Sequence, residues 1–152
     1  MSWLKAELKT TLVLPKVCAV KLNVVDGDVT ATDVSGTLGF HLVDGDLELS
    51  GCSGAYDVHT VDGDISIVDG KGNLETHTVD GDIKATGEFD MVHVKSTDGD
   101  ARIVVTGISG MAGDWAMGSV DGDLTLIIPD DLSFRLEAGS MDGDIEMEGF
   151  SN

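Results

Sequence analysis

The chain of 152 residues is long enough for one domain, and its 28 acidic and 9 basic side chains give a formal net charge of −19. A surface of this charge argues against nucleic acid as a partner and against binding to anionic membranes. Two cysteines, Cys18 and Cys52, are too few for a disulfide framework and are expected to be small buried side chains. The sequence contains no run of about 20 apolar residues, so no membrane-spanning segment is predicted.

Residues 1–10 come before the first sequence repeat, and we expect them to form an N-terminal cap. A short helix could open at Ser2-Trp3-Leu4, or a strand could lie within residues 8–14. Either element would cover an open end of a repeat protein, which would otherwise expose core residues and unpaired strand edges. The first 24 residues carry four lysines and no long apolar run, so we expect no signal peptide in this chain, and the compartment is left open.

Residues 15–28 show the pattern of one strand followed by a turn. Val20, Leu22 and Val24 point to one side of an extended chain, and the polar residues between them point to the other. Alternation with a period of two is typical of a half-buried strand. The tripeptide Asp26-Gly27-Asp28 then turns the chain, and a second strand follows it.

This Asp-Gly-Asp tripeptide organises the whole sequence, because it occurs seven times. Its copies begin at Asp26, Asp44, Asp62, Asp80, Asp98, Asp121 and Asp142. The first four intervals are 18 residues each, and the last two are 23 and 21 residues. Internal repeats of such a period indicate a solenoid, in which each repeat packs only against its neighbours.

Alignment of the repeats places apolar residues in columns before and after each turn. The first residue after the turn is, in successive repeats, Val29, Leu47, Ile65, Ile83, Ala101, Leu124 and Ile145. Equivalent residues of a parallel β-solenoid stack about 4.8 Å apart, and such columns form its core. The sequence therefore predicts an all-β fold, a single-stranded parallel β-solenoid (β-helix) of about seven rungs of 18–23 residues with two strands per coil. One domain spans residues 1–152, and residues 148–152 form its C-terminal end.

The second corner of each coil is expected to be looser than the Asp-Gly-Asp turn. The longer repeats place their extra residues at this corner, around Pro129 and in residues 107–113, which we expect to bulge from the body. Glycine recurs at both corners, where tight bends need a positive φ.

Two coil geometries fit a period of 18 residues. A left-handed triangular helix of hexapeptides would turn residues such as Val43, Leu49 and Val61 inward. A coil with two longer strands accounts better for the alternation before each turn, and parallel crossovers are right-handed in about 98% of cases. We therefore favour a right-handed coil with two strands.

The repeated unit Val-x-Gly-Asp-Ile/Val/Leu, preceded by an alternating strand, resembles a bacterial adhesin-type family of domains of unknown function. Residues 15–29 and 129–145 match this unit well, and the resemblance covers about residues 12–148. It implies a β-solenoid found in bacterial proteins, often associated with the cell envelope, with no established enzymatic activity. This chain departs from the family in having Asp at the first turn position, where Ser or Asn is more common.

The seven turns create two stacked rows of carboxylates. Charges about 4.8 Å apart repel each other by about 1 kcal/mol even in water, so something must offset the repulsion. In one explanation the second Asp of each turn, such as Asp28 or Asp64, accepts hydrogen bonds from backbone N–H groups of its own turn. The other is a ladder of Ca²⁺ ions, which take six to eight oxygen ligands each. The residues of this calcium ladder would be Asp26, Asp44, Asp62, Asp80 and Asp98.

All four histidines are expected on one outer face of one sheet. They are His41, His59, His77 and His93. The first three occupy one column, and the fourth lies two residues earlier on the next rung. Stacked imidazoles can bind Zn²⁺, Ni²⁺ or Cu²⁺, and Asp57 and Glu75 in the neighbouring column could assist. Repeat duplication alone would also stack identical side chains on an exposed polar face.

No motif in the sequence indicates catalysis, since the Gly-x-Ser-x-Gly nucleophile elbow is absent. We therefore expect a non-enzymatic structural or adhesive scaffold of a bacterium that binds a protein or polysaccharide surface, with no cofactor unless the turns take Ca²⁺. One alternative is a calcium-binding module, and another is a self-polymerising β-helix that forms homo-oligomers. A third is a carbohydrate-active β-helix enzyme, which would need a groove with two close carboxylates and an arginine.

Overall fold

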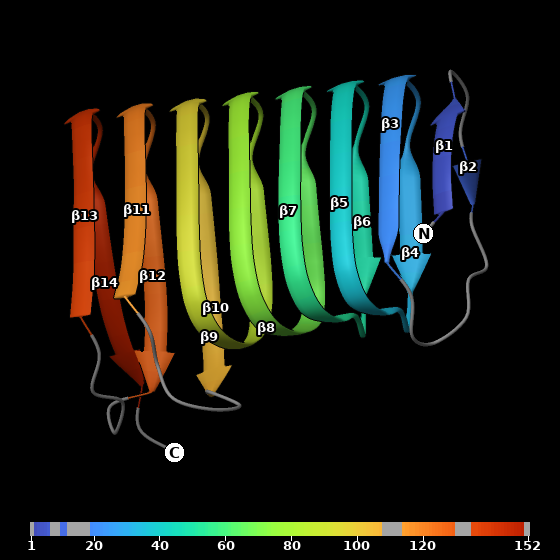
Figure 1. Cartoon of the computed structure of the whole chain (residues 1–152). Helices are drawn as coiled ribbons and strands as arrows, with labels where there is room; N and C mark the ends of the chain where they lie inside the picture. The colour runs from blue at the N-terminus through green and yellow to red at the C-terminus, as the bar shows by residue number, and fades with distance from the viewer. Residues whose placement is uncertain (1, 7–9, 12–18, 108–113, 130–134, 151–152) are drawn as a thin grey trace.

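A computed structural model of the chain describes residues 2–6, 10–11, 19–107, 114–129 and 135–150. Within these residues every regular element is a β-strand, and none is a helix that could cross a membrane. The strands wind into a parallel β-solenoid of about seven turns, which confirms the predicted fold (Figure 1). The loop expected to bulge from the body comprises residues 107–113, and residues 108–113 lie outside the described part.

The strands form two faces of the coil, here called the front sheet and the back sheet after their places in Figure 1. The front sheet holds β1, β3, β5, β7, β11 and β13, and the back sheet holds β2, β4, β6, β10, β12 and β14, while β8 and β9 run from the back sheet into the front sheet. The bounds are β1 Ser2–Ala6, β2 Thr10–Thr11, β3 Val20–Asp26, β4 Val29–Thr32, β5 Ser35–Asp44, β6 Leu47–Ser50, β7 Ser53–Asp62, β8 Ile65–Asp80, β9 Ile83–Asp98, β10 Ala101–Gly107, β11 Asp114–Asp121, β12 Leu124–Pro129, β13 Arg135–Asp142 and β14 Ile145–Phe150.

The coil is right-handed. The front strands run up to the Asp-Gly-Asp turns and the back strands run down, while the chain advances from the N-terminal end on the right to the C-terminal end on the left (Figure 1). The alternative triangular helix of hexapeptides is wrong, because Val43 and Val61, which it would turn inward, are each 48% exposed. The front strands have a side-chain period of two, so alternate residues point to opposite faces of the sheet, as in a coil with two long strands.

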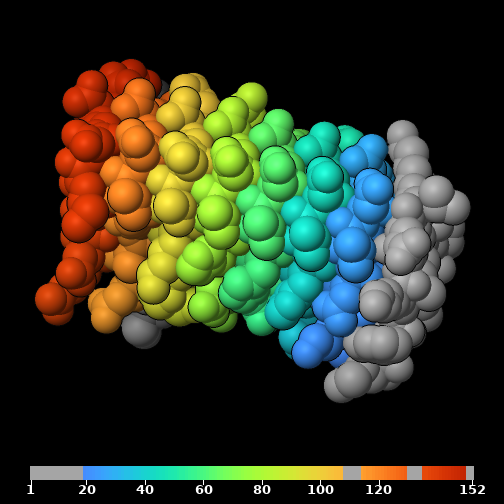
Figure 2. Space-filling model, turned by 90° about the horizontal axis from the view of Figure 1, so that it is seen from above, coloured from blue at the N-terminus to red at the C-terminus, as the bar shows by residue number. Residues whose placement is uncertain are grey.

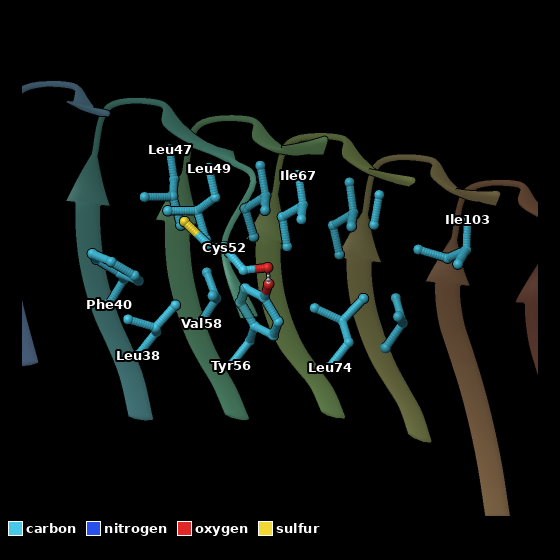
Figure 3. Packing of buried hydrophobic residues seen from close by; sticks show 14 of the residues in the cluster. Leu38, Phe40, Leu47, Leu49, Cys52, Tyr56, Val58, Ile67, Leu74 and Ile103 are labelled. Atoms are coloured by element: carbon cyan, nitrogen blue, oxygen red, sulfur yellow. Dashed lines mark hydrogen bonds between the residues drawn. The ribbon is translucent and has the colours of Figure 1, made fainter. Parts of the chain in front are cut away.

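The predicted apolar columns form the core between the two sheets. In the first column after the turns, every residue from Val29 to Leu124 is at most 1% exposed. Figure 3 shows Leu38, Phe40 and Leu49 in the space between the strands. At the last rung of this column Ile145 is 44% exposed, because no further described rung packs against it.

The Asp-Gly-Asp turns stack so closely that only glycine fits at their centres. Gly45 and Gly63 have φ angles of 134° and 137°, which L side chains rarely adopt. A Cβ atom added at Gly63 would lie 2.1 Å from the carbonyl oxygen of Gly45 on the preceding rung. The N–H of Gly45 also donates to the carbonyl of Asp62 at 3.0 Å. Seen from above this edge, the rungs follow one another as regular bands (Figure 2).

The second corner is less open than the sequence predicts. Both β8 and β9 continue through it as strands of 16 residues, so these coils hold one bent strand instead of two. Hydrogen bonds between rungs persist around the corner, as from the N–H of Gly51 to the carbonyl of Val68 at 2.9 Å. Glycines stack here too, because a Cβ atom at Gly54 would lie 2.0 Å from the carbonyl oxygen of Gly36.

The N-terminal residues form strands, and the expected opening helix is wrong. Residues Ser2–Ala6 form β1, which pairs in parallel with β3 and places Leu4 opposite Leu22. Thr10–Thr11 form β2, which pairs with β4. An incomplete rung of this kind satisfies the backbone N–H and C=O groups at the edges of β3 and β4, which a helix would have left unpaired.

A buried polar contact lies inside the core near the second corner. The hydroxyl of Tyr56 donates to the carbonyl oxygen of Cys52 and accepts a hydrogen bond from the N–H of Lys71 at 3.2 Å (Figure 3). Burial removes water from the phenolate form and raises the pKa of Tyr56 from 10.0 to about 12. Cys52 is a buried free thiol, as predicted, and Cys18 lies outside the described residues.

We predict that the free energy of unfolding falls as the pH rises from 10 toward 12. The folded protein holds the Tyr56 proton more tightly than the unfolded chain, so this contribution is fully present below pH 10 and is lost as the pH rises through about 12. The loss is about 2–3 kcal/mol. Tyr56 is the only tyrosine, so tyrosinate absorbance reports its pKa directly. Tyr56→Phe serves as the control that lacks this pH dependence, and a titration midpoint near 10 in the folded protein would contradict the prediction.

Candidate functional site

The second Asp of each turn caps the turn of the next rung. Oδ1 of Asp46 accepts a hydrogen bond from the N–H of Asp64 at 2.9 Å, and Oδ1 of Asp64 accepts one from the N–H of Asp82 at 2.9 Å. The same bond links every pair of successive turns from Asp28 to Asp144. The sequence predicted bonds within one turn, but the stacking brings the N–H of the neighbouring rung within reach. These charge-assisted bonds offset part of the repulsion within the row.

The first Asp of each turn lies exposed along the same corner. In the part of the chain that the structure describes, none of these carboxylates belongs to a set of three metal-ligating atoms within 4.8 Å of one another. The calcium ladder on Asp26, Asp44, Asp62, Asp80 and Asp98 stays a prediction.

Three of the four histidines form a row on the outer face of the front sheet. Parallel pairing places His59 directly opposite both His41 and His77. The ring centroids of His41 and His59 lie 4.9 Å apart, and those of His59 and His77 lie 5.6 Å apart. Lys95 on β9 is the next residue of the row.

The fourth histidine lies on the same face in the neighbouring row. His93 pairs with Glu75 and not with His77. Together with His59 and His77 it lines a groove of about 470 Å³ on the outer face. The structure thus brings all four histidines to one face, as predicted, but stacks only three of them.

One group of residues brings three metal-ligating atoms together. Ligand atoms of His41, Asp57 and His59 all lie within 4.8 Å of one another. Nδ1 of His59 lies 3.0 Å from Oδ1 of Asp57 on the same strand, β7. Glu75, the second carboxylate that the sequence suggested, is not part of this group.

A row of exposed valines runs beside the histidines, and the sequence analysis did not identify it. The residue before the turn is Val25, Val43, Val61, Val79 or Val120 on five rungs, each 41–48% exposed. Four of these valines and three histidines line a second groove, of about 570 Å³. The signal was present in the sequence, because each valine follows an inward-facing residue and so must face outward in a strand.

The two grooves place imidazole, carboxylate and lysine groups beside apolar side chains. Neither lining includes an arginine, which a carbohydrate-active solenoid was expected to need beside two close carboxylates. The arrangement combines an apolar row and a row of imidazoles on one sheet, where strand pairing holds both in register.

We predict that Asp64→Ala lowers the free energy of unfolding by about 1–2 kcal/mol, because it removes the acceptor of a charge-assisted hydrogen bond. Asp62→Ala is the matched control, with the same charge change in the same turn, and is expected to change stability by no more than about 0.5 kcal/mol. Urea unfolding of both variants measures the difference. Equal losses of stability in the two variants would contradict the capping role. The calcium ladder would be favoured if Ca²⁺ stabilised the protein, Na⁺ at equal ionic strength did not, and Asp62→Ala abolished the effect.

The fold and the repeats can be compared with known proteins. No curated protein and no solved structure matches the chain. The model of the Toastrack family, DUF4097, matches residues 15–151. This match supports the resemblance to a domain of unknown function, but it does not support the adhesin label. The chain therefore belongs to the Toastrack family of uncharacterised domains.

Proposed function

We propose that this Toastrack domain is a non-enzymatic scaffold that binds a protein partner on the outer face of its front sheet. The observation that carries the proposal is the valine row, in which Val25, Val43, Val61, Val79 and Val120 are each close to half exposed on a regular surface. Exposed apolar side chains that gather on one face, as Val25, Val43, Val61 and Val79 do, are typical of interaction sites. The neighbouring histidine row widens the surface.

Burial of the valine row would supply the affinity. Removal of a half-exposed valine side chain from water contributes about 0.5–1 kcal/mol. Val25, Val43, Val61 and Val79 lie on four successive rungs about 4.8 Å apart, so they form a continuous apolar row and act together, and Thr97 on the next rung separates them from Val120. The groove of about 570 Å³ along Val25, Val43, Val61 and Val79 offers space for apolar side chains of a partner.

Charge indicates which partner fits. Each valine is followed directly by the first Asp of its turn, so the valine row runs beside a row of carboxylates. The whole chain carries a net charge of −19. A protein segment with lysine or arginine beside its apolar residues would meet opposite charge here. Such complementarity raises the association rate and excludes acidic competitors. A polysaccharide, the other surface that the sequence suggested, has no comparable apolar and basic pattern.

A synthetic peptide of alternating valine and lysine tests the proposal, with a peptide of alternating serine and lysine as the charge-matched control. We predict that the valine peptide perturbs the backbone NMR signals of Val43, His59 and Val61, and that the serine peptide does not. Val61→Glu is expected to weaken binding about tenfold, which corresponds to about 1.4 kcal/mol. Val68→Glu on the back sheet, where the side chain is 44% exposed, is expected to leave binding unchanged.

Two results would overturn this proposal. Equal binding of both peptides, with perturbed signals along the Asp rows, would show charge attraction without a docking surface. Equal weakening by Val61→Glu and Val68→Glu would show that the front sheet has no special role.

A further inference from the structure

We infer that His41, Asp57 and His59 form a binding site for one Zn²⁺ ion. The three residues come from two adjacent strands of the front sheet, β5 and β7. The inference does not depend on the proposed protein partner, because the ion would be held by residues of this chain alone.

Strand pairing brings the three side chains together. His41 on β5 lies directly opposite His59 on β7, so their rings project from the same face with centroids 4.9 Å apart. Asp57 lies two residues before His59 on the same strand, and side chains at this spacing share a face. As a result, one ligand atom from each residue lies within 4.8 Å of the other two.

The surroundings of Nδ1 of His59 add a second observation. Its Nδ1 atom is shielded from solvent and makes no hydrogen bond, although Oδ1 of Asp57 lies 3.0 Å away. A nitrogen that is shielded from water and lies beside a carboxylate without an aligned hydrogen bond is only partly compensated for its lost hydration. Coordination of a metal ion by the nitrogen lone pair and the carboxylate would satisfy both groups at once.

The ligand types favour a transition-metal ion such as Zn²⁺ over Ca²⁺. Two imidazoles and one carboxylate match the three-ligand sites that Zn²⁺ occupies, with bonds of about 2.0–2.2 Å and a fourth position left for water or another ligand. Ca²⁺ prefers six to eight oxygen ligands and is disfavoured by two nitrogens. Bonds of this length in a tetrahedron place the ligand atoms about 3.3 Å apart. Oδ1 of Asp57 and Nδ1 of His59 already lie 3.0 Å apart, so the exposed side chain of His41 has to close most of the remaining distance.

The rest of the histidine face provides matched controls. His77 is the next ring of the row, 5.6 Å from His59, and does not belong to the group of three. His93 lies one row over, where it pairs with Glu75. Neither residue is expected to bind the ion, although both are histidines on the same surface.

Isothermal titration of chelator-treated protein with Zn²⁺ alone tests the inference. We expect one Zn²⁺ per chain. His41→Ala, His59→Ala and Asp57→Asn are each expected to weaken binding at least about tenfold, since each removes one of three ligands. His93→Ala and Asp62→Asn, which remove a histidine of the same face and a turn carboxylate, are expected to bind like the parent protein. Circular dichroism confirms that every variant keeps its fold.

NMR of the imidazole nitrogens gives a readout that does not rest on affinity. Zn²⁺ is expected to shift the ring nitrogens of His41 and His59 and to leave those of His93 unchanged. Unchanged affinity in His41→Ala and His59→Ala, or equal weakening in His93→Ala, would overturn the site. Binding of several ions without preference would show that the acidic surface attracts Zn²⁺ without a specific site, and would also overturn it. Because no peptide is present, none of these outcomes decides whether the valine row binds a partner.

Discussion

The contact of glycine on glycine at the Asp-Gly-Asp corner is the constraint on which the rest of the structure depends. At the turns from Gly45 to Gly143, an added Cβ atom would lie 2.1–2.3 Å from the carbonyl oxygen of the preceding turn glycine. This close approach lets each strand pair with its neighbour at the ordinary β spacing of about 4.8 Å. The glycine N–H then reaches the carbonyl of the first Asp on the next rung, and the second Asp reaches the N–H of its successor. Rung spacing, turn capping and strand register are therefore consequences of one repeated tripeptide.

The same spacing turns each sequence position into a row on the surface. Inward positions give apolar columns, and outward positions of the front sheet give one row of valines and one of histidines. A row of side chains about 4.8 Å apart suits two kinds of ligand. An extended apolar and basic segment can follow the valines, while a metal ion can be held where two histidines and Asp57 meet across β5 and β7. Both proposals therefore arise from the register, and each concerns a different set of side chains.

Much of the fold could be predicted from the sequence, because period and alternation are properties of the chain itself. The columns through Leu47 and Ile65 needed only the interval of 18 residues and the period of two. The partner of the Asp64 carboxylate could not be predicted, since it depends on how far one turn is displaced relative to the next. For the same reason the sequence could not decide that Asp57, and not Glu75, joins the histidines. The valine row was predictable, because alternation alone directs Val43 and Val61 outward.

The most direct test of this account is the stability of Gly63→Ala compared with Gly139→Ala. Gly63 has a φ of 137°, and a Cβ built on it would lie 2.1 Å from the carbonyl oxygen of Gly45, whereas nothing lies within 4 Å of a Cβ built at Gly139. The account predicts that Gly63→Ala lowers the free energy of unfolding by about 2 kcal/mol or more, and that Gly139→Ala leaves it nearly unchanged. Urea unfolding of the two variants measures both values. Similar stability of the two variants would contradict the claim that stacked turn glycines set the spacing of the solenoid.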